Sequence, residues 1–164
     1  MTGVTAVAAV NIAGKRARAR RDDLLDEALS PPEDVTHHDI ATADGGSVHV
    51  VDTGAGQPVV LLHGVTLQWW VWSAVIRMLR ADHRVIAWDM RGHGRSVAGR
   101  RGVSLEACAD DLTAVLETFD LRDAIVVGHS MGGMVLGRFV VQSADVARDR
   151  VGGAVFLATS CNSL

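Results

Sequence analysis

Short apolar runs alternate with helix-like stretches along the chain after residue 35. Continuous apolar runs occur at Val59–Leu62, Val85–Trp88 and Ala124–Val127, and such runs are typical of strands that are covered on both faces. Val151–Ala158 predicts a fourth strand of this series. These runs therefore indicate a sheet whose middle is buried.

Helical periodicity fills the gaps between the predicted strands. Helices are expected at Trp69–Leu79 and at Met131–Gln142. Between them, Ser104 is placed to cap a third helix. Apolar residues at steps of three and four give this third helix one buried stripe, formed by Leu105, Cys108, Leu112, Val115, Leu116 and Phe119.

A hairpin precedes this alternating pattern. Thr36–Thr42 and Ser47–Thr53 flank the turn signal Asp44-Gly45-Gly46, which favours two antiparallel strands. A hairpin followed by β-α-β-α-β-α-β predicts the α/β class, with a mainly parallel sheet and right-handed crossovers. A length of 164 residues suggests one domain.

Residues 1–34 differ from the rest and are expected to form a leader to a domain at 35–164, with Pro31-Pro32 at the junction. Thr2–Gly14 is small and apolar, and Lys15–Arg21 is strongly basic. The apolar part is too short for a bilayer, which needs about 20 residues, and it lacks the order of a secretory signal. Two interpretations stay open: a flexible basic leader, or an interfacial anchor that places the arginines of residues 1–21 at anionic lipids. The tail of a longer hydrophobic helix, followed by cytoplasmic positive charge, would leave the same pattern.

Composition and charge limit the classes of ligand and partner that the chain is expected to bind. A net charge of −3 argues against a nucleic-acid binder. Cys108 and Cys161 form no CxxC pair, which favours two reduced thiols in a cytoplasmic protein. No metal and no cofactor are expected, because metal-ligand spacing is absent among His37, His38, His49 and His83.

Three polar segments follow three of the predicted strands: His63–Thr66, Asp89–Ser96 and Gly128–Gly133. Ligands of open α/β sheets bind beyond the carboxyl ends of the parallel strands. The sequence therefore predicts that these three segments share one edge of the sheet and form its functional site.

The third segment has the G-x-S-x-G pattern, centred on Ser130. In a nucleophile elbow, a strand turns sharply into a helix, and the serine sits at the apex in a strained conformation. Gly128 and Gly132 are needed because strand and helix approach closely there, and Gly133 extends the clearance. The helix N-terminus favours negative charge, and the Met131 N–H points to where an oxyanion would develop.

With their order and spacing, LLHG at Leu61–Gly64, DMRGHGRS at Asp89–Ser96 and GHSMGG at Gly128–Gly133 resemble the α/β-hydrolase superfamily, in its esterase, lactonase and perhydrolase-like branch. The resemblance covers roughly residues 36–160. It implies the N-terminal portion of the α/β-hydrolase fold.

The resemblance also implies roles for individual residues. Ser130 would be the nucleophile that forms an acyl-enzyme with a small ester, thioester or lactone. The backbone amides of Met131 and Val65 would form the oxyanion hole, although Thr66 could also face the site. Other motif residues are expected to shape the loops rather than to perform chemistry: His63, Gly64, Asp89, Arg91, Gly92, His93, Gly94, Gly128, His129 and Gly132. Trp69, Trp70 and Trp72 are expected in the core or in an acyl pocket, and Asp110 and Asp111 are expected to face solvent.

The triad of this fold runs serine, acid, histidine, and the second half is missing here. No histidine follows Ser130, the acids Asp145 and Asp149 lie near the end of the elbow helix, and Asn162 stands where some relatives carry the acid. The last strands, the last helices and the lid are missing too. We therefore expect a fragment or an early-terminated copy that is inactive alone, with an exposed sheet edge that promotes aggregation or recruits a partner.

Alternatives to an ester hydrolase are a non-catalytic binding module with the same pocket and a non-heme peroxidase or perhydrolase. A proline in the oxyanion loop would favour the peroxidase, and Val65-Thr66 gives it no support. The serine at the apex excludes an aspartate nucleophile. A nucleotide-binding domain would need G-x-G-x-x-G or a P-loop lysine, and neither is present.

Overall fold

The computed structural model describes residues 23, 25–26 and 28–160. The predicted leader, its membrane contact, Cys161 and Asn162 lie wholly or mostly outside these residues. Among the described residues, no helix has the length and apolarity needed to cross a membrane. Near the junction, the Arg77 guanidinium of helix α2 (Ser73–Leu79) donates hydrogen bonds to the carbonyls of Ala28 and Ser30.

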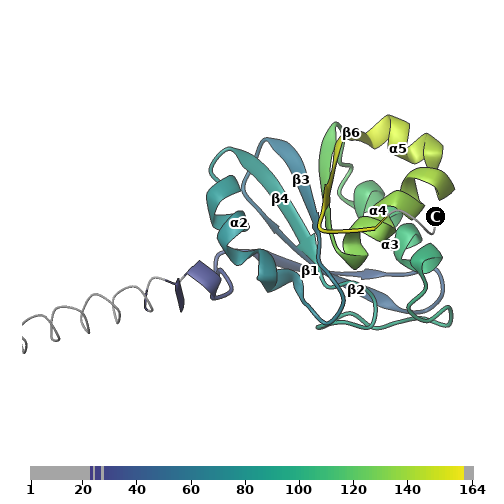
Figure 1. Ribbon diagram of the computed structural model, residues 1–164, viewed down its shortest axis with the longest axis horizontal. Helices are drawn as coiled ribbons and strands as arrows, with labels where there is room; N and C mark the ends of the chain where they lie inside the picture. Colours follow the sequence, from purple (N-terminus) through teal and green to yellow (C-terminus); the bar gives the residue numbers. More distant parts are fainter. Residues whose placement is uncertain (1–22, 24, 27, 161–164) are drawn as a thin grey trace, which may run out of the picture.

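One six-stranded sheet organises the chain, in the order β1-β2-β4-β3-β5-β6 (Figure 1). β1, β2 and β4 pair antiparallel, whereas β3 pairs in parallel with β4 and β5, and β5 in parallel with β6. The predicted hairpin and mainly parallel sheet are thus confirmed. The strands are β1 (Thr36–Ala41), β2 (Ser47–Thr53), β3 (Gln57–Leu62), β4 (His83–Trp88), β5 (Ala124–His129) and β6 (Val151–Leu157).

Helices cover the two faces of the sheet (Figure 1). Successive residues of a strand point to opposite faces, so Val60 and Leu62 pack on the α3 and α4 side, whereas Val59 and Leu61 pack on the α2 side. Because both faces of these strands are covered, their sequences are continuous apolar runs. The helices are η1 (Trp69–Trp72), α2 (Ser73–Leu79), α3 (Leu105–Thr118), α4 (Met131–Gln142) and α5 (Ala144–Arg150).

Two predicted helices need correction. The helix expected at Trp69–Leu79 begins as the 3₁₀ turn η1 and becomes α-helical only at Ser73, whose hydroxyl donates to the carbonyl of Trp70. Asp145 and Asp149 lie on the separate helix α5 rather than at the end of α4. The Ser104 cap of α3 is confirmed, because its hydroxyl accepts from the N–H of Ala107 at 3.2 Å.

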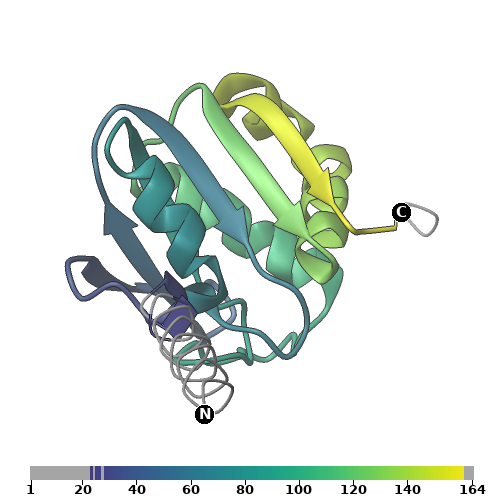
Figure 2. The same cartoon turned by 60° about the vertical axis from the view of Figure 1, so that its left-hand side comes forward.

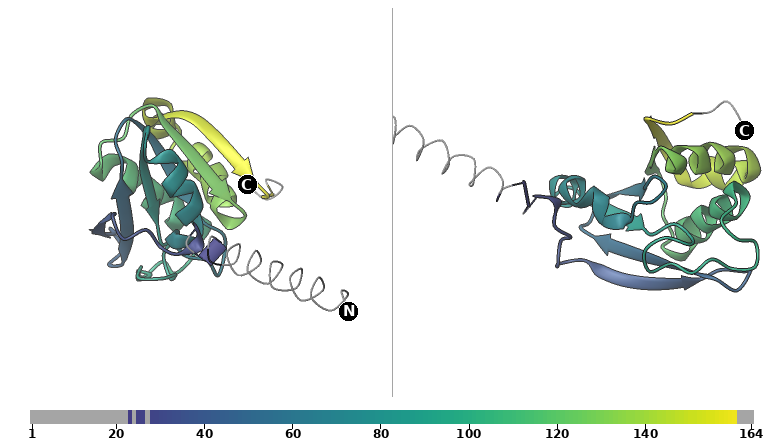
Figure 3. Two further views of the ribbon diagram at one scale, coloured as in Figure 1. Left: turned by 90° about the vertical axis from the view of Figure 1, so that its left-hand side faces the viewer. Right: turned by 60° about the horizontal axis from the view of Figure 1, so that its bottom comes forward.

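β6 forms one edge of the sheet, with α4 and α5 beside it (Figure 2). Val155, Phe156 and Leu157 are 45%, 44% and 47% exposed. Figure 3 shows the same strand from two further directions, again at the rim of the fold. The edge expected from the sequence is present, and its side chains are apolar.

Candidate active site

Ser130 lies at the turn between β5 and α4, in a strained backbone conformation. Its φ of 52° and ψ of −116° are costly for a residue with a side chain, and such strain persists only where the surroundings impose it. The Ser130 N–H donates to the carbonyl of Leu157 at 3.0 Å. Its carbonyl accepts from the Thr159 hydroxyl at 2.6 Å. The segment at the end of β6 therefore clamps the apex.

The glycines around Ser130 are required by close backbone contacts. A Cβ on Gly128 would lie 2.5 Å from the carbonyl oxygen of Gly132, and one on Gly132 would lie 2.5 Å from that of Leu62. A Cβ on Gly133 would lie 2.6 Å from the Cβ of Thr159. Real Cβ atoms do not approach so closely, so the strand-to-helix turn has the geometry of a nucleophile elbow.

The loop that follows β3 lies against the elbow. A Cβ on Gly64 would lie 3.1 Å from the Cβ of Ser130, so the next residue, Val65, is close to the apex. Thr66 has a φ of 64°, which is strained for a β-branched residue. Within the described residues, the N–H groups of Val65 and Met131 donate no hydrogen bond. Both amides are thus available to an incoming oxyanion.

The rings of His63 and His129 have partners other than Ser130 among the described residues. His63 is fully buried; its Nδ1 lies 2.7 Å from the carbonyl of Gly64, and its Nε2 accepts from the Met90 N–H at 2.9 Å. Burial lowers the pKa of His63. The His129 ring packs edge-on against Trp72 with centroids 6.4 Å apart. Among the described side chains, none hydrogen-bonds the Ser130 hydroxyl.

The tryptophans after this loop divide between core and surface. Trp69 and Trp72 are 7% exposed and pack with α2, whereas Trp70 is 42% exposed. The two buried rings support the core interpretation of these positions.

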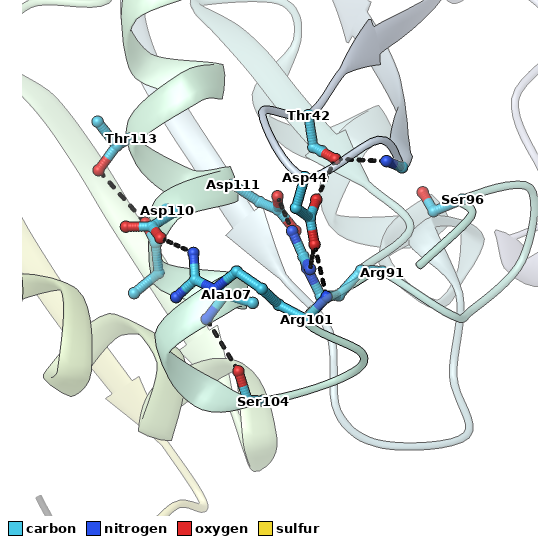
Figure 4. Close-up of polar contacts among 12 residues, drawn as sticks. Thr42, Asp44, Arg91, Ser96, Arg101, Ser104, Ala107, Asp110, Asp111 and Thr113 are labelled. Carbon is cyan, nitrogen blue, oxygen red and sulfur yellow. Dashed lines mark hydrogen bonds and ion pairs between the residues drawn. The ribbon is translucent and has the colours of Figure 1, made fainter. Parts of the chain in front are cut away.

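The loop after β4 is held by a buried ion cluster (Figure 4). Arg91 binds both carboxylate oxygens of Asp111 at 2.7 Å and reaches Asp44 at 3.0 Å. The expectation that Asp111 faces solvent is wrong: it is 2% exposed, whereas Asp110 is partly exposed and pairs with Arg101. Asp111 lies on the buried stripe of α3, where it neutralises Arg91.

Hydrogen bonds shift the pKa values of this cluster. The pKa of Arg91 is raised above its usual value, chiefly by its hydrogen bonds to Asp111. The pKa of Asp44 is lowered by hydrogen bonds from the Thr42 hydroxyl, the Arg101 N–H and Arg91. Burial raises the pKa of Asp111, and the hydrogen bonds from Arg91 oppose that shift. Arg91 and Asp44 are therefore charged at neutral pH, and their contacts with Asp111 serve to fix the loop.

Asp89 fixes the same loop from the other side. A Cβ on Gly94 would lie 2.3 Å from the Asp89 carboxylate, and Gly92 and Gly94 have φ values of 75° and 52°. His93 packs its ring edge-on against His63, with centroids 5.3 Å apart. These contacts fit the loop-shaping role expected for the motif.

His49 was not singled out by its position in the sequence, yet it is fully buried in this region. Its Nδ1 lies 2.9 Å from Asp89 Oδ2, and its Nε2 lies 2.9 Å from Nδ1 of His37. A histidine inside the apolar run Val48–Val51 was the available signal, because a buried polar side chain needs a partner. No cluster of metal-ligating side chains occurs among the described residues.

Fold and site together define an α/β protein with a strained serine at a tight strand-to-helix turn. A sequence profile described as "alpha/beta hydrolase fold" matches residues 57–164. The chain belongs to this alpha/beta hydrolase family.

Similar proteins differ in their named activities. A non-heme chloroperoxidase of Kitasatospora aureofaciens is 42% identical over 100 residues, which is 60% of this chain and 36% of that protein. A soluble epoxide hydrolase of Corynebacterium sp. is 34% identical over 113 residues, or 69% of this chain and 39% of that protein. An esterase of Exiguobacterium antarcticum superposes with a TM-score of 0.72 at 27% identity, covering 77% of this chain and 46% of the esterase. The chain thus spans less than half the length of each relative.

Proposed function

We propose that this chain supplies the nucleophile and the oxyanion hole of a serine hydrolase that acts on carboxylic esters, thioesters or lactones. The strained backbone of Ser130 is the main support for the proposal. A φ of 52° is energetically unfavourable for serine, and such strain is concentrated at functional sites. Gly64, packed against Ser130, brings the second amide donor within reach.

In the proposed reaction, Ser130 Oγ attacks the acyl carbonyl carbon and a C–O bond forms. The carbonyl oxygen becomes negative and accepts hydrogen bonds from the N–H groups of Val65 and Met131. A general base takes the hydroxyl proton and passes it to the departing alcohol or thiol. Water then cleaves the acyl-serine ester, which regenerates Ser130.

We propose that the base and its acid partner come from polypeptide outside the described residues. Both ring nitrogens of His63 already have partners, and His129 is packed against Trp72. The lengths of the relatives are consistent with a further segment. Because a serine without a base is a weak nucleophile, we expect only slow turnover by the 164-residue chain.

Acylation of Ser130 tests this proposal. The chain is incubated with p-nitrophenyl acetate, with imidazole as an external base, and peptide mass spectrometry locates the acetyl group. We expect acetyl-Ser130, with no adduct at this peptide in Ser130→Ala. Unselective acylation would contradict the proposal. Ligand binding without acylation would favour a non-catalytic module instead.

The role of the Met131 amide has a matched pair of variants. Proline is tolerated in the first turn of a helix and has no N–H, so Met131→Pro, which also restricts the backbone of Ser130, should slow acylation by about 10²-fold or more. Met131→Ala retains the N–H and should acylate at nearly the rate of the unmodified chain. Equal rates in two folded variants would exclude this amide from the oxyanion hole.

A perhydrolase is the second candidate, and the peroxidase activity named for the Kitasatospora aureofaciens relative favours it. Here hydrogen peroxide, instead of water, attacks the acyl-serine carbonyl and releases a peracid. Addition of peroxide to acetyl-Ser130 should then yield peracetic acid in preference to acetate. Acetate alone would contradict this candidate.

A further inference from the structure

The carboxylate of Asp89 joins three segments beneath the proposed oxyanion hole. Its Oδ1 accepts from the Trp69 N–H at 2.9 Å, and its Oδ2 accepts from the Arg95 N–H at 3.0 Å. The third contact comes from His49 Nδ1 on β2, at 2.9 Å. Because a carboxylate oxygen accepts hydrogen bonds, His49 must carry its proton on Nδ1.

These contacts tie down the loop of residues 63–68 at both ends. Trp69 follows the loop and is held by Asp89, whereas His63 begins it and is held by the N–H of Met90. Two consecutive residues after β4 thus hold both ends of the loop. Val65, which bears a proposed oxyanion donor, lies between them. The position of Val65 therefore depends on that of the Asp89 carboxylate.

The ring of His49 can be varied without disturbing its backbone. The His49 carbonyl accepts from the Asp89 N–H at 3.0 Å, and its N–H donates to the Ser96 hydroxyl at 2.8 Å. His49 and Asp89 are 0% and 1% exposed, so water cannot replace the ring as a donor. Beyond it, His37 fixes the ring plane through the contact between Nδ1 of His37 and Nε2 of His49.

We infer that His49 is a positioning residue, which acts through Asp89 to hold the oxyanion loop against Ser130. The inference rests on the proposed function, because only that function makes the loop of residues 63–68 part of an oxyanion hole. It extends that function to β2 (Ser47–Thr53), a strand outside all three motifs, and it gives a role to a buried histidine that none of the motifs contains.

Two variants of similar size separate positioning from packing. His49→Asn keeps a side-chain N–H near the place of Nδ1, and His49→Leu removes it. We expect hydrogen exchange of the Trp69 and Arg95 amides to be roughly tenfold faster in His49→Leu and within about twofold of the unmodified chain in His49→Asn. The Val126 amide on β5 should keep its protection in both variants.

The Ser130 acetylation rate should follow the same order, falling in His49→Leu and recovering in His49→Asn. Unchanged protection of Trp69 in His49→Leu would overturn the inference, and so would an equal loss of protection at Val126. Faster exchange at Trp69 with an unchanged acetylation rate would also overturn it, while the proposed function would stand. Absence of acetyl-Ser130 in the unmodified chain would instead contradict the proposed function, whereas the exchange data need no substrate.

Discussion

β5 and β6 are neighbouring parallel strands with opposite surroundings. β5 pairs on both sides and buries Ala124 and Val126 completely. β6 pairs only with β5 among the described strands, and Val155 and Phe156 are nearly half exposed. An open cavity of about 380 Å³ lies beside β6, lined by Val140, Ala144, Ala147, Arg148, Val151, Gly152, Gly153 and Ala154.

This difference explains how the chain can hold a strained serine. Packing on both faces and pairing on both edges fix β5, so the cost of the Ser130 conformation is met by a rigid strand. β6 contributes the clamp through the carbonyl of Leu157, yet its outer edge pairs with no other strand among the described residues. Ser130 is therefore held by rigid surroundings, although it adjoins the outermost described strand of the sheet.

Charge removal should have the largest effect on stability. Arg91→Met leaves the buried carboxylate of Asp111 without its partner and should lower the free energy of unfolding by about 3–5 kcal/mol. Arg148→Met, beside β6, removes an exposed pair with Asp145 and should cost less than about 0.5 kcal/mol. Urea unfolding measures both. Similar losses would contradict the difference in burial between the Arg91–Asp111 pair and the Arg148–Asp145 pair.

A methyl group added to each strand should have the next largest effect. Gly128→Ala on β5 forces a Cβ against the backbone of Gly132 and should cost about 1–3 kcal/mol. Gly153→Ala on β6 meets only Ile125, at 3.8 Å, and should change stability by less than about 1 kcal/mol. Thermal melts of the two variants provide the comparison. Equal tolerance at both positions would show that the elbow is not tightly packed.

Low pH should destabilise the ion cluster of Asp44, Arg91 and Asp111 more than the region around β6. The pKa of Asp44 is lowered in the folded chain, so Asp44 adds stability above its ordinary pKa of 3.8, and this is lost as pH falls through the lower folded value. The Tm difference between the unmodified chain and Asp44→Asn should be largest near neutral pH and should narrow below about pH 4. Asp145→Asn, fully exposed near β6, is the control. A Tm difference that grows as the pH falls would contradict the lowered pKa of Asp44.

Charge on the free edge should alter association more than stability. Phe156→Lys should change the free energy of unfolding by less than about 0.5 kcal/mol and should reduce self-association in sedimentation, because charged edges resist pairing. Val141→Lys, at an exposed position on α4, is the matched surface change. Self-association that persists in Phe156→Lys would show that the chains associate through a surface other than β6.

Local patterns predicted most of the fold. The hairpin, the buried strands and the capped helix α3 follow from periodicity and turn residues, and the elbow follows from Gly128, Ser130 and Gly132. The split of Trp69–Leu79 into η1 and α2 could not be predicted. It is accompanied by a hydrogen bond from the Ser73 hydroxyl to the Trp70 carbonyl, and hydrophobic periodicity carries no information about such a bond.

Long-range polar contacts were missed. His49 meets Asp89 because β2 lies beside β4, and strand order is not written in local sequence. Asp111 offered a clearer signal: it follows Cys108 by three residues and therefore shares the buried stripe of α3. A charge on such a stripe implies a buried partner, which the structure identifies as Arg91.

A hybrid protein gives the most direct test of whether this chain supplies a working nucleophile and oxyanion hole that lack only a base and its acid. Residues 57–160 would replace the matching segment of the Exiguobacterium antarcticum esterase, whose remainder follows. Hydrolysis of p-nitrophenyl acetate is measured in hybrids that melt cooperatively. We expect turnover at enzymatic rates that disappears in Ser130→Ala, with far slower turnover by the 164-residue chain alone. A folded hybrid without Ser130-dependent turnover, or equally fast turnover by the chain alone, would contradict this division of the active site.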